Sequence, residues 1–161
     1  MNTRTMVSEK VGEDNYIPAY YSPSPDGQQI AVVEEYPGLP RGLVIRTLRT
    51  NQRRLLVPLA EGVTGKSRIG HTQAAWAGEA NVIFWTGNCS LFRTDPTTGA
   101  TTKLRDGCVN SRYEQVAAAP DGSFVIATKY EQRYLGNDSL EVSSTAWKIA
   151  GDGSWEERLP K

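Results

Sequence analysis

A tight turn followed by an apolar run occurs twice in this chain and constrains its fold more than any other feature. The first copy is Ser-Pro-Asp-Gly at 24–27, followed by Ile-Ala-Val-Val at 30–33. The second copy is Ala-Pro-Asp-Gly at 119–122, followed by Phe-Val-Ile-Ala at 124–127. Proline fixes φ early in a turn, aspartate accepts hydrogen bonds from the nearby backbone, and glycine adopts positive φ. Each copy therefore predicts a turn that leads into a β-strand.

A degenerate third copy lies between these two. Residues 77–85 keep the turn-like composition and the apolar run but lack the Pro-Asp-Gly sequence. The three runs begin at Ile30, Val82 and Phe124, which are 52 and 42 residues apart. Repeats of about 40–50 residues are typical of stacked β-sheet units. The chain is therefore predicted to be a repeat protein of β-strands.

Turn signals and apolar runs divide the chain into three meanders of four strands, which predicts an all-β fold. The expected strands are residues 16–21, 30–36, 43–48 and 53–59, then 72–76, 82–86, 90–94 and 101–104, then 115–119, 124–130, 143–149 and 154–159. The domain is expected to span 16–161, with units at about 16–59, 72–104 and 115–159, and to follow a flexible N-terminal segment at 1–15. The four tryptophans, Trp76, Trp85, Trp147 and Trp155, fall on expected strands, where packing is favoured over sugar binding.

These motifs carry a resemblance to a known architecture. The turn at 24–27 before an apolar strand, the segment Leu-Phe-Arg-Thr-Asp at 91–95 and the pair Thr-Gly at 98–99 resemble TolB-type and WD-repeat β-propellers. The Gly70-His71 pair is similar to the Gly-His of WD repeats, and the whole resemblance covers roughly 16–159. It implies that each meander is one blade and that the chain is half of a six-bladed propeller. It implies no particular activity, because propellers serve binding proteins, enzymes and lipoproteins alike.

Three blades are fewer than a propeller needs to close, since four to eight are typical. A second copy could complete the ring, so we expect a homodimer. The expected interface joins three residues of the third meander to three of the first meander in the second copy: Phe124, Ile126 and Trp147 against Ile30, Val32 and Val44. Two alternatives stay open, namely a fragment of a longer propeller and an open domain capped by the N-terminal segment.

Composition restricts the possible partners. The 18 basic residues balance 18 acidic ones, so no global field attracts nucleic acid. No stretch of 18 apolar residues is present, which predicts no membrane span. The N-terminal residues lack the apolar region of a secretory signal. A cytoplasmic location is expected for the chain as it stands, and a periplasmic or secreted one if a leader has been removed.

Candidate chemical motifs are few. Residues 60–67 partly match a phosphate-binding loop, but the expected strand at 72–76 leaves no room for the required helix. His71 has no metal ligand at a suitable spacing, so no metal and no cofactor are expected. No Gly-x-Ser-x-Gly nucleophile motif is present, and no catalytic residue is proposed. Cys89 and Cys108 flank a predicted hairpin and could form a disulfide, the alternative being two unrelated thiols.

The loops that join second to third strands, and fourth strands to the next first strand, gather on one face of such a fold. These loops contain Tyr36, Arg41, Lys66, Arg68, His71, Arg112, Tyr113, Arg133 and Tyr134. Tyrosine and arginine dominate the energetics of protein interfaces, although the residues could also be ordinary solvated loop residues. We therefore expect a non-catalytic protein that binds a protein partner through this face. The alternatives are a small-molecule or carbohydrate site in the central tunnel of an assembled propeller and, third, an enzyme.

Overall fold

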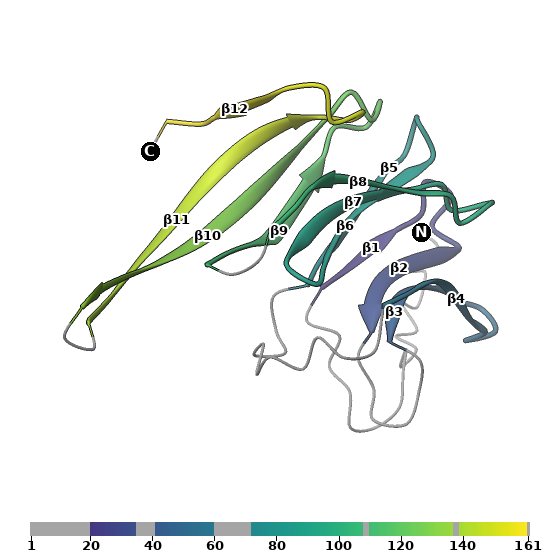
Figure 1. Cartoon of the computed structure of the whole chain (residues 1–161). Helices are drawn as coiled ribbons and strands as arrows, with labels where there is room; N and C mark the ends of the chain where they lie inside the picture. The colour runs from purple at the N-terminus through teal and green to yellow at the C-terminus, as the bar shows by residue number, and fades with distance from the viewer. Residues whose placement is uncertain (1–19, 35–40, 60–71, 108–109, 137–138, 161) are drawn as a thin grey trace, which may run out of the picture.

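The computed structural model describes residues 20–34, 41–59, 72–107, 110–136 and 139–160 of the chain. Within these ranges, twelve β-strands form three four-stranded antiparallel sheets, and no helix occurs. In each sheet the strands lie side by side in the order in which they follow one another along the chain (Figure 1). The prediction of an all-β chain built from three four-stranded meanders is therefore confirmed.

The strands have the following bounds. The first sheet contains β1 (Tyr21–Pro23), β2 (Gln29–Glu34), β3 (Gly42–Thr47) and β4 (Arg53–Pro58). The second sheet contains β5 (Ala74–Ala77), β6 (Val82–Gly87), β7 (Ser90–Thr94) and β8 (Thr101–Arg105). The third sheet contains β9 (Ser111–Ala118), β10 (Phe124–Gly136), β11 (Ser139–Ala150) and β12 (Glu156–Arg158). The N-terminal segment at 1–15 lies outside the described residues.

The first Pro-Asp-Gly turn shows why this sequence forms a hairpin. The Gly27 amide donates a hydrogen bond to the Ser24 carbonyl over 2.9 Å, and Gly27 has a φ of 67°, which favours glycine. The Asp26 carboxylate accepts a hydrogen bond from the Ser24 hydroxyl at 2.6 Å and another from the Gln28 amide at 3.0 Å. These two bonds, the first being the larger cause, lower the pKa of the Asp26 carboxyl. Side-chain and backbone hydrogen bonds thus fix the same turn.

Two strands of the third sheet differ most from the sequence-based prediction. β10 and β11 are 13 and 12 residues long and extend far beyond their neighbours (Figure 1). The sequence predicted strands only at 124–130 and 143–149, because polar and charged residues lie between them. Pairing continues with Gln132 opposite Val142 and Tyr134 opposite Leu140, so the predicted long loop is wrong. A two-stranded ribbon can have polar side chains on both faces. The polar residues after Tyr130 therefore do not mark the end of strand β10.

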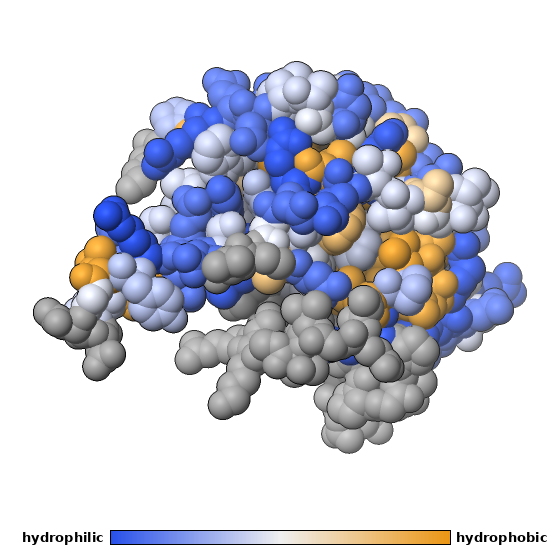
Figure 2. Space-filling view, viewed as in Figure 1, coloured by the Kyte–Doolittle hydropathy of each residue, from blue (hydrophilic) through white to orange (hydrophobic). Residues whose placement is uncertain are grey.

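We call the outer part of these two strands, residues 129–136 and 139–145, the projecting hairpin. The first six residues of β11 are all exposed, as are the last four of β10. An apolar patch is visible at the outer end of the hairpin (Figure 2). The exposed large apolar side chains of the hairpin are Tyr134, Leu135, Leu140 and Val142, which are 72%, 58%, 43% and 47% exposed.

Two apolar cores lie between the sheets. In the core between the first and second sheets, the rings of Trp85 and Phe92 stack with 4.6 Å between centroids. The indole N–H of Trp85 donates to the Thr94 hydroxyl at 2.8 Å, so its polar atom is satisfied inside the core. The core between the second and third sheets includes Phe84 of β6 and Ile149 of β11. The second sheet is therefore packed on both faces.

The interface residues predicted for a second copy are placed differently by the structure. Ile30, Val32 and Val44 are only 5%, 2% and 0% exposed, so the first sheet does not present them as an uncovered apolar face. Trp147 pairs with Ala127 and packs against the core toward the second sheet, on the face of β11 opposite to the predicted one. For these four residues the prediction is wrong, because a strand that is apolar on both faces does not reveal which of its faces is covered. Phe124 and Ile126 are half-buried, and their part of the interface stays a prediction.

Candidate binding surface

The residues predicted to bind a partner fall into two groups. Tyr36, Lys66, Arg68 and His71 lie outside the described residues, as does the glycine-rich segment at 60–67. Arg41, Arg112, Tyr113, Arg133 and Tyr134 are described. Arg41 directly precedes β3, and its carbonyl accepts the Leu59 amide at 2.8 Å. The WD-like Gly-His pair at 70–71 also lies outside the described residues, so this part of the resemblance stays a prediction.

Arg112 and Tyr113 belong to strand β9 rather than to a loop. The Arg112 guanidinium forms an ion pair with Glu114 at 2.5 Å and lies over the ring of Tyr130, 4.1 Å from its centroid. Tyr113 is only 6% exposed and packs between the second and third sheets. Burial is the main cause that raises the pKa of the Tyr113 hydroxyl. Tyr113 is thus a core residue and is not part of the predicted recognition surface.

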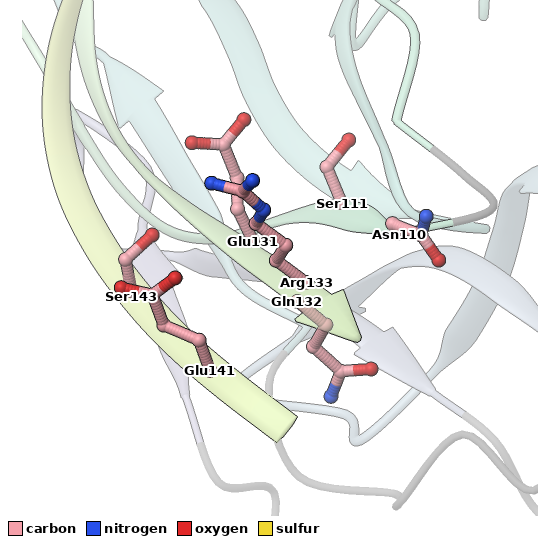
Figure 3. Close-up of a pocket in the computed structure, with 7 residues that line it drawn as sticks. All are labelled: Asn110, Ser111, Glu131, Gln132, Arg133, Glu141 and Ser143. Carbon is pink, nitrogen blue, oxygen red and sulfur yellow. The ribbon is translucent and has the colours of Figure 1, made fainter. Parts of the chain in front are cut away.

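Arg133 lines a groove of about 490 Å³ at the base of the projecting hairpin (Figure 3). The groove is formed by polar and charged residues from β9, β10 and β11 and from the residue before β9: Asn110, Ser111, Glu131, Gln132, Arg133, Glu141 and Ser143. The side chains of Glu131, Arg133 and Glu141 gather on one face of the two long strands, and Gln132 points away from them (Figure 3). Successive side chains of a strand point to opposite faces, which explains why Gln132 lies on the other face from Glu131 and Arg133.

The charges of the groove are balanced. Glu131 forms an ion pair with Lys129 at 2.9 Å, and Arg133 stands opposite Glu141 in the pairing of β10 with β11. Its lining has two carboxylates and one guanidinium, and Lys129 beside the groove supplies the second positive charge, so the region has no excess charge that would favour an anion or a cation. Its lining offers hydroxyl, amide, carboxylate and guanidinium groups, which match the donors and acceptors of a peptide or of sugar hydroxyls.

A smaller depression of about 90 Å³ shares Asn110, Ser111 and Gln132 with the groove. Its other lining residues are Cys89, Arg112 and Tyr130. The Gln132 amide donates to the Asn110 carbonyl at 2.7 Å, which ties the start of β9 to the base of the hairpin. Of the predicted site residues, the structure therefore brings Arg112 and Arg133 to the same region, one in each depression.

Sequence reasoning missed most of the groove because it treated its residues as a loop. Glu131 and Arg133 on one strand and Glu141 and Ser143 on the other alternate with residues of the opposite face. This period of two is the signal that could have revealed them. The polar character of both faces obscured it.

The cysteine prediction stays a prediction, because Cys108 lies outside the described residues. Asn88 and Cys89 form the two-residue connection between β6 and β7, with φ values of 46° and 66°. Gly107, the residue before Cys108, approaches the backbone of Cys89 so closely that a Cβ there would lie 2.1 Å from the Cys89 carbonyl oxygen.

Two negative findings concern only the part of the chain that the structure describes. There, no group of three or more histidine, cysteine, aspartate or glutamate residues is arranged to hold a metal ion. The described ranges also contain no helix of the length and apolar character needed to cross a membrane.

Comparison with solved structures defines the class of fold. The sequence matches no protein-family model and no curated protein. The chain is similar in structure to TolB from Acinetobacter baumannii, with a TM-score of 0.50 and 14% identity over 87% of this chain and 42% of that protein. It is also similar to oligogalacturonate lyase from Vibrio parahaemolyticus, with a TM-score of 0.54 and 13% identity over 88% of this chain and 38% of the lyase.

A structure of oligogalacturonate lyase in complex with manganese gives the same TM-score of 0.54, at 10% identity over 88% of this chain and 43% of that one. These proteins are β-propellers, and the three sheets described above have the same architecture. The chain spans less than half the length of each of them. At such low identity the similarity establishes a propeller fold alone, and the three sheets are consistent with half of a propeller.

Proposed function

We propose that this chain is a non-catalytic binding protein that recognises a protein partner through the groove and the surrounding face. The observation that carries the proposal is the groove itself, whose lining residues are all polar or charged and come from three adjoining strands and the residue before β9. Its paired donors and acceptors suit an extended peptide, whose backbone presents both kinds of group.

The neighbouring side chains support a protein rather than a small molecule as the ligand. Tyr134 and Leu135 directly follow Arg133 and are 72% and 58% exposed. Arginine and tyrosine side chains are enriched among the residues that dominate binding energy at protein interfaces. Exposed apolar side chains beside a polar groove are also typical of protein interaction sites.

Selection from a phage-displayed random peptide library tests this function. We expect related sequences to be enriched, and a labelled peptide of that family to bind at least about tenfold more weakly to the double variant Arg133→Ala, Glu141→Ala. The double variant Glu157→Ala, Arg158→Ala on the short strand β12 is the matched control and should bind as the wild type does. Failure to enrich any related sequences would contradict the proposal.

Carbohydrate binding is the second candidate, since the same polar lining could bind sugar hydroxyls. A thermal-shift screen with oligogalacturonate and a set of neutral oligosaccharides separates the two, because a ligand that binds only the folded state raises its melting temperature. A raised melting temperature that is lost in the Arg133→Ala, Glu141→Ala variant would favour the carbohydrate site over the peptide site.

The proposal includes association with a second copy of the chain. Its support is the coverage of 38–43% of the propellers to which the chain is similar, so two copies together approach the length of one of them. The interface predicted from sequence is not retained, because Ile30, Val32 and Val44 are buried within the single chain. The contact is therefore sought on surfaces that are exposed in the single chain.

A further inference from the structure

The projecting hairpin has exposed apolar side chains and, within the part of the chain that the structure describes, an unpaired strand edge. Its two strands leave the third sheet and have no third strand beside them at the outer end (Figure 1). A two-stranded ribbon is only marginally stable in water by itself, whereas three or more strands with an apolar face are stable. The hairpin has such an apolar set in Tyr134, Leu140 and Val142. Among the described residues, β9 pairs with β10 only as far as Glu131, and no strand lies beside the outer part of the hairpin.

One edge of the hairpin is open to pairing. Among the described residues, β12 pairs with β11 only at residues 147–149, and the Leu159 amide bonds to the Ala146 carbonyl at 2.9 Å. Residues 139–145 of β11 therefore have a strand neighbour on the β10 side only. An edge of this kind presents a row of backbone donors and acceptors that another strand can use.

The hydrogen-bond pattern shows which groups point outward from this edge. The Gln132 amide donates to Asn110 on the β9 side, so Gln132 and its partner Val142 do not bond to each other. Val142 therefore directs its N–H and C=O away from β10, and by alternation Leu140 and Ser144 do the same. Ala146 is an even number of residues from Val142, so its backbone groups should point the same way. Its carbonyl accepts the hydrogen bond from Leu159 on the side away from β10, as expected.

We propose that the open edge of β11 pairs antiparallel with the same edge of a second copy, about a two-fold axis that passes Val142. This inference rests on the self-association proposed above and states where it occurs. The open edge spans residues 139–145, and its midpoint is Val142, so pairing centred there uses the whole edge. Two hairpins then form one four-stranded sheet, with the apolar side chains of both copies on a shared face.

Charge favours this register and a second copy as the partner. With the axis at Val142, Glu141 lies opposite Ser143 of the other copy and Leu140 lies opposite Ser144. An axis at Glu141 would instead place two carboxylates opposite each other, which is unfavourable. The formal net charge of the chain is zero, so two copies do not repel each other as whole molecules. A self-complementary edge is what a two-fold dimer requires.

Sedimentation equilibrium of the full chain and two variants tests the inference. The wild type should sediment at twice the chain mass of 17.7 kDa at micromolar concentration. Val142→Lys places two ammonium groups across the axis and should raise the dimer dissociation constant at least about tenfold. Leu135→Lys adds the same charge to an exposed apolar position of β10, away from the pairing edge, and should stay dimeric. Circular dichroism should show the same β-sheet content for all three.

The outcomes separate this inference from the proposed function. A Val142→Lys chain that remains as dimeric as the wild type would overturn the pairing edge and leave self-association in place. A monomeric wild type would overturn the second copy as the partner, whatever the peptide selection shows. In that case a strand from a different protein is the next occupant to test.

A cysteine placed on the axis tests the register. Residues opposite each other in antiparallel strands have Cα atoms about 4.5–5.5 Å apart, within the range of a disulfide. Oxidised Val142→Cys should therefore give a peptide linked to its own copy at residue 142, identified by mass spectrometry apart from peptides of Cys89 and Cys108. Leu140→Cys is the control, because four residues of offset place its two copies about 13 Å apart. Equal linkage of both variants would overturn the register.

Discussion

The two halves of the long β10–β11 pair have different environments, although they belong to the same strands. In the inner half, Val125, Ala127 and Ile149 are 0% exposed and pack against the second sheet. In the outer half, the hairpin projects into solvent, and its apolar side chains are largely exposed. Backbone pairing continues through both halves without a change of register until Tyr134. Strand pairing and core formation are therefore separable in this sheet, and each can be tested by itself.

The largest expected effect concerns the inner half. Ile149→Ala removes buried side-chain atoms between two sheets and should lower the free energy of unfolding by about 3–4 kcal/mol. Leu135→Ala removes a side chain of similar size from the outer half and should change it by no more than about 0.5 kcal/mol. Urea unfolding followed by tryptophan fluorescence measures both values. If Ile149→Ala does not fold, Ile149→Val should still cost about 1 kcal/mol. Equal effects of the two alanine variants would contradict the division into packed and projecting halves.

A smaller loss of stability is expected when the glycines of the two Pro-Asp-Gly turns are replaced. These turns compare the first sheet with the third. Gly27 and Gly122 have φ values of 67° and 70°, so alanine should cost about 1 kcal/mol at either position. A Cβ at Gly122 would lie 2.7 Å from the Cβ of Ala80 in the turn between β5 and β6, whereas at Gly27 it would meet no atom within 4 Å.

Gly122→Ala should therefore cost at least about 1 kcal/mol more than Gly27→Ala, the difference being the overpacking term. Chemical denaturation of the two single variants gives this difference directly. An equal loss in both variants would show that the contact between the turn and the second sheet relaxes without cost.

The smallest expected effect is the pH dependence of the turn at 119–122. The Ser123 amide and hydroxyl both donate to Asp121, and these bonds lower the pKa of its carboxyl. The unfolded carboxyl has a pKa of about 3.9, so the stabilisation is present above that pH and is lost as the pH falls through the lower folded value. Asp121→Asn should therefore be less stable than the wild type at pH 7 and approach it near pH 3. Urea midpoints at both pH values measure this, and a constant gap between the two proteins would argue against a contribution from the charge.

The sequence predicted the architecture because its turns are determined locally. Asp26 and Gly27 make their hydrogen bonds with Ser24 and Gln28, so the sequence of the turn alone indicates a hairpin. The extension of β10 beyond Tyr130 is also a local hairpin, since Arg133 pairs with Glu141 and Tyr134 with Leu140, but its polar residues resemble a loop and no turn motif marks it. The groove could not be predicted for the same reason. Its residues come together only once 131–133 and 141–143 are known to be paired.

The sequence also could not show which face of each apolar strand packs against the second sheet. Ile30 and Val125 belong to similar apolar runs, yet Val125 faces the second sheet and Ile30 does not. Both runs are apolar throughout, and only the order of the sheets in space shows which face of each run meets the second sheet. Tyr113 shows the reverse case, since a residue expected on a binding loop is part of a core.

The burial of strand β6 determines which parts of the molecule can unfold separately. All six of its residues are buried, with Ile83 and Trp85 in one core and Val82 and Phe84 in the other. No opening that frees β6 can leave either contact between sheets intact. Its amide protons should therefore exchange with solvent deuterium only when the whole molecule unfolds, and the outer amides of the hairpin should exchange long before. One short strand thus makes the three sheets a single cooperative unit.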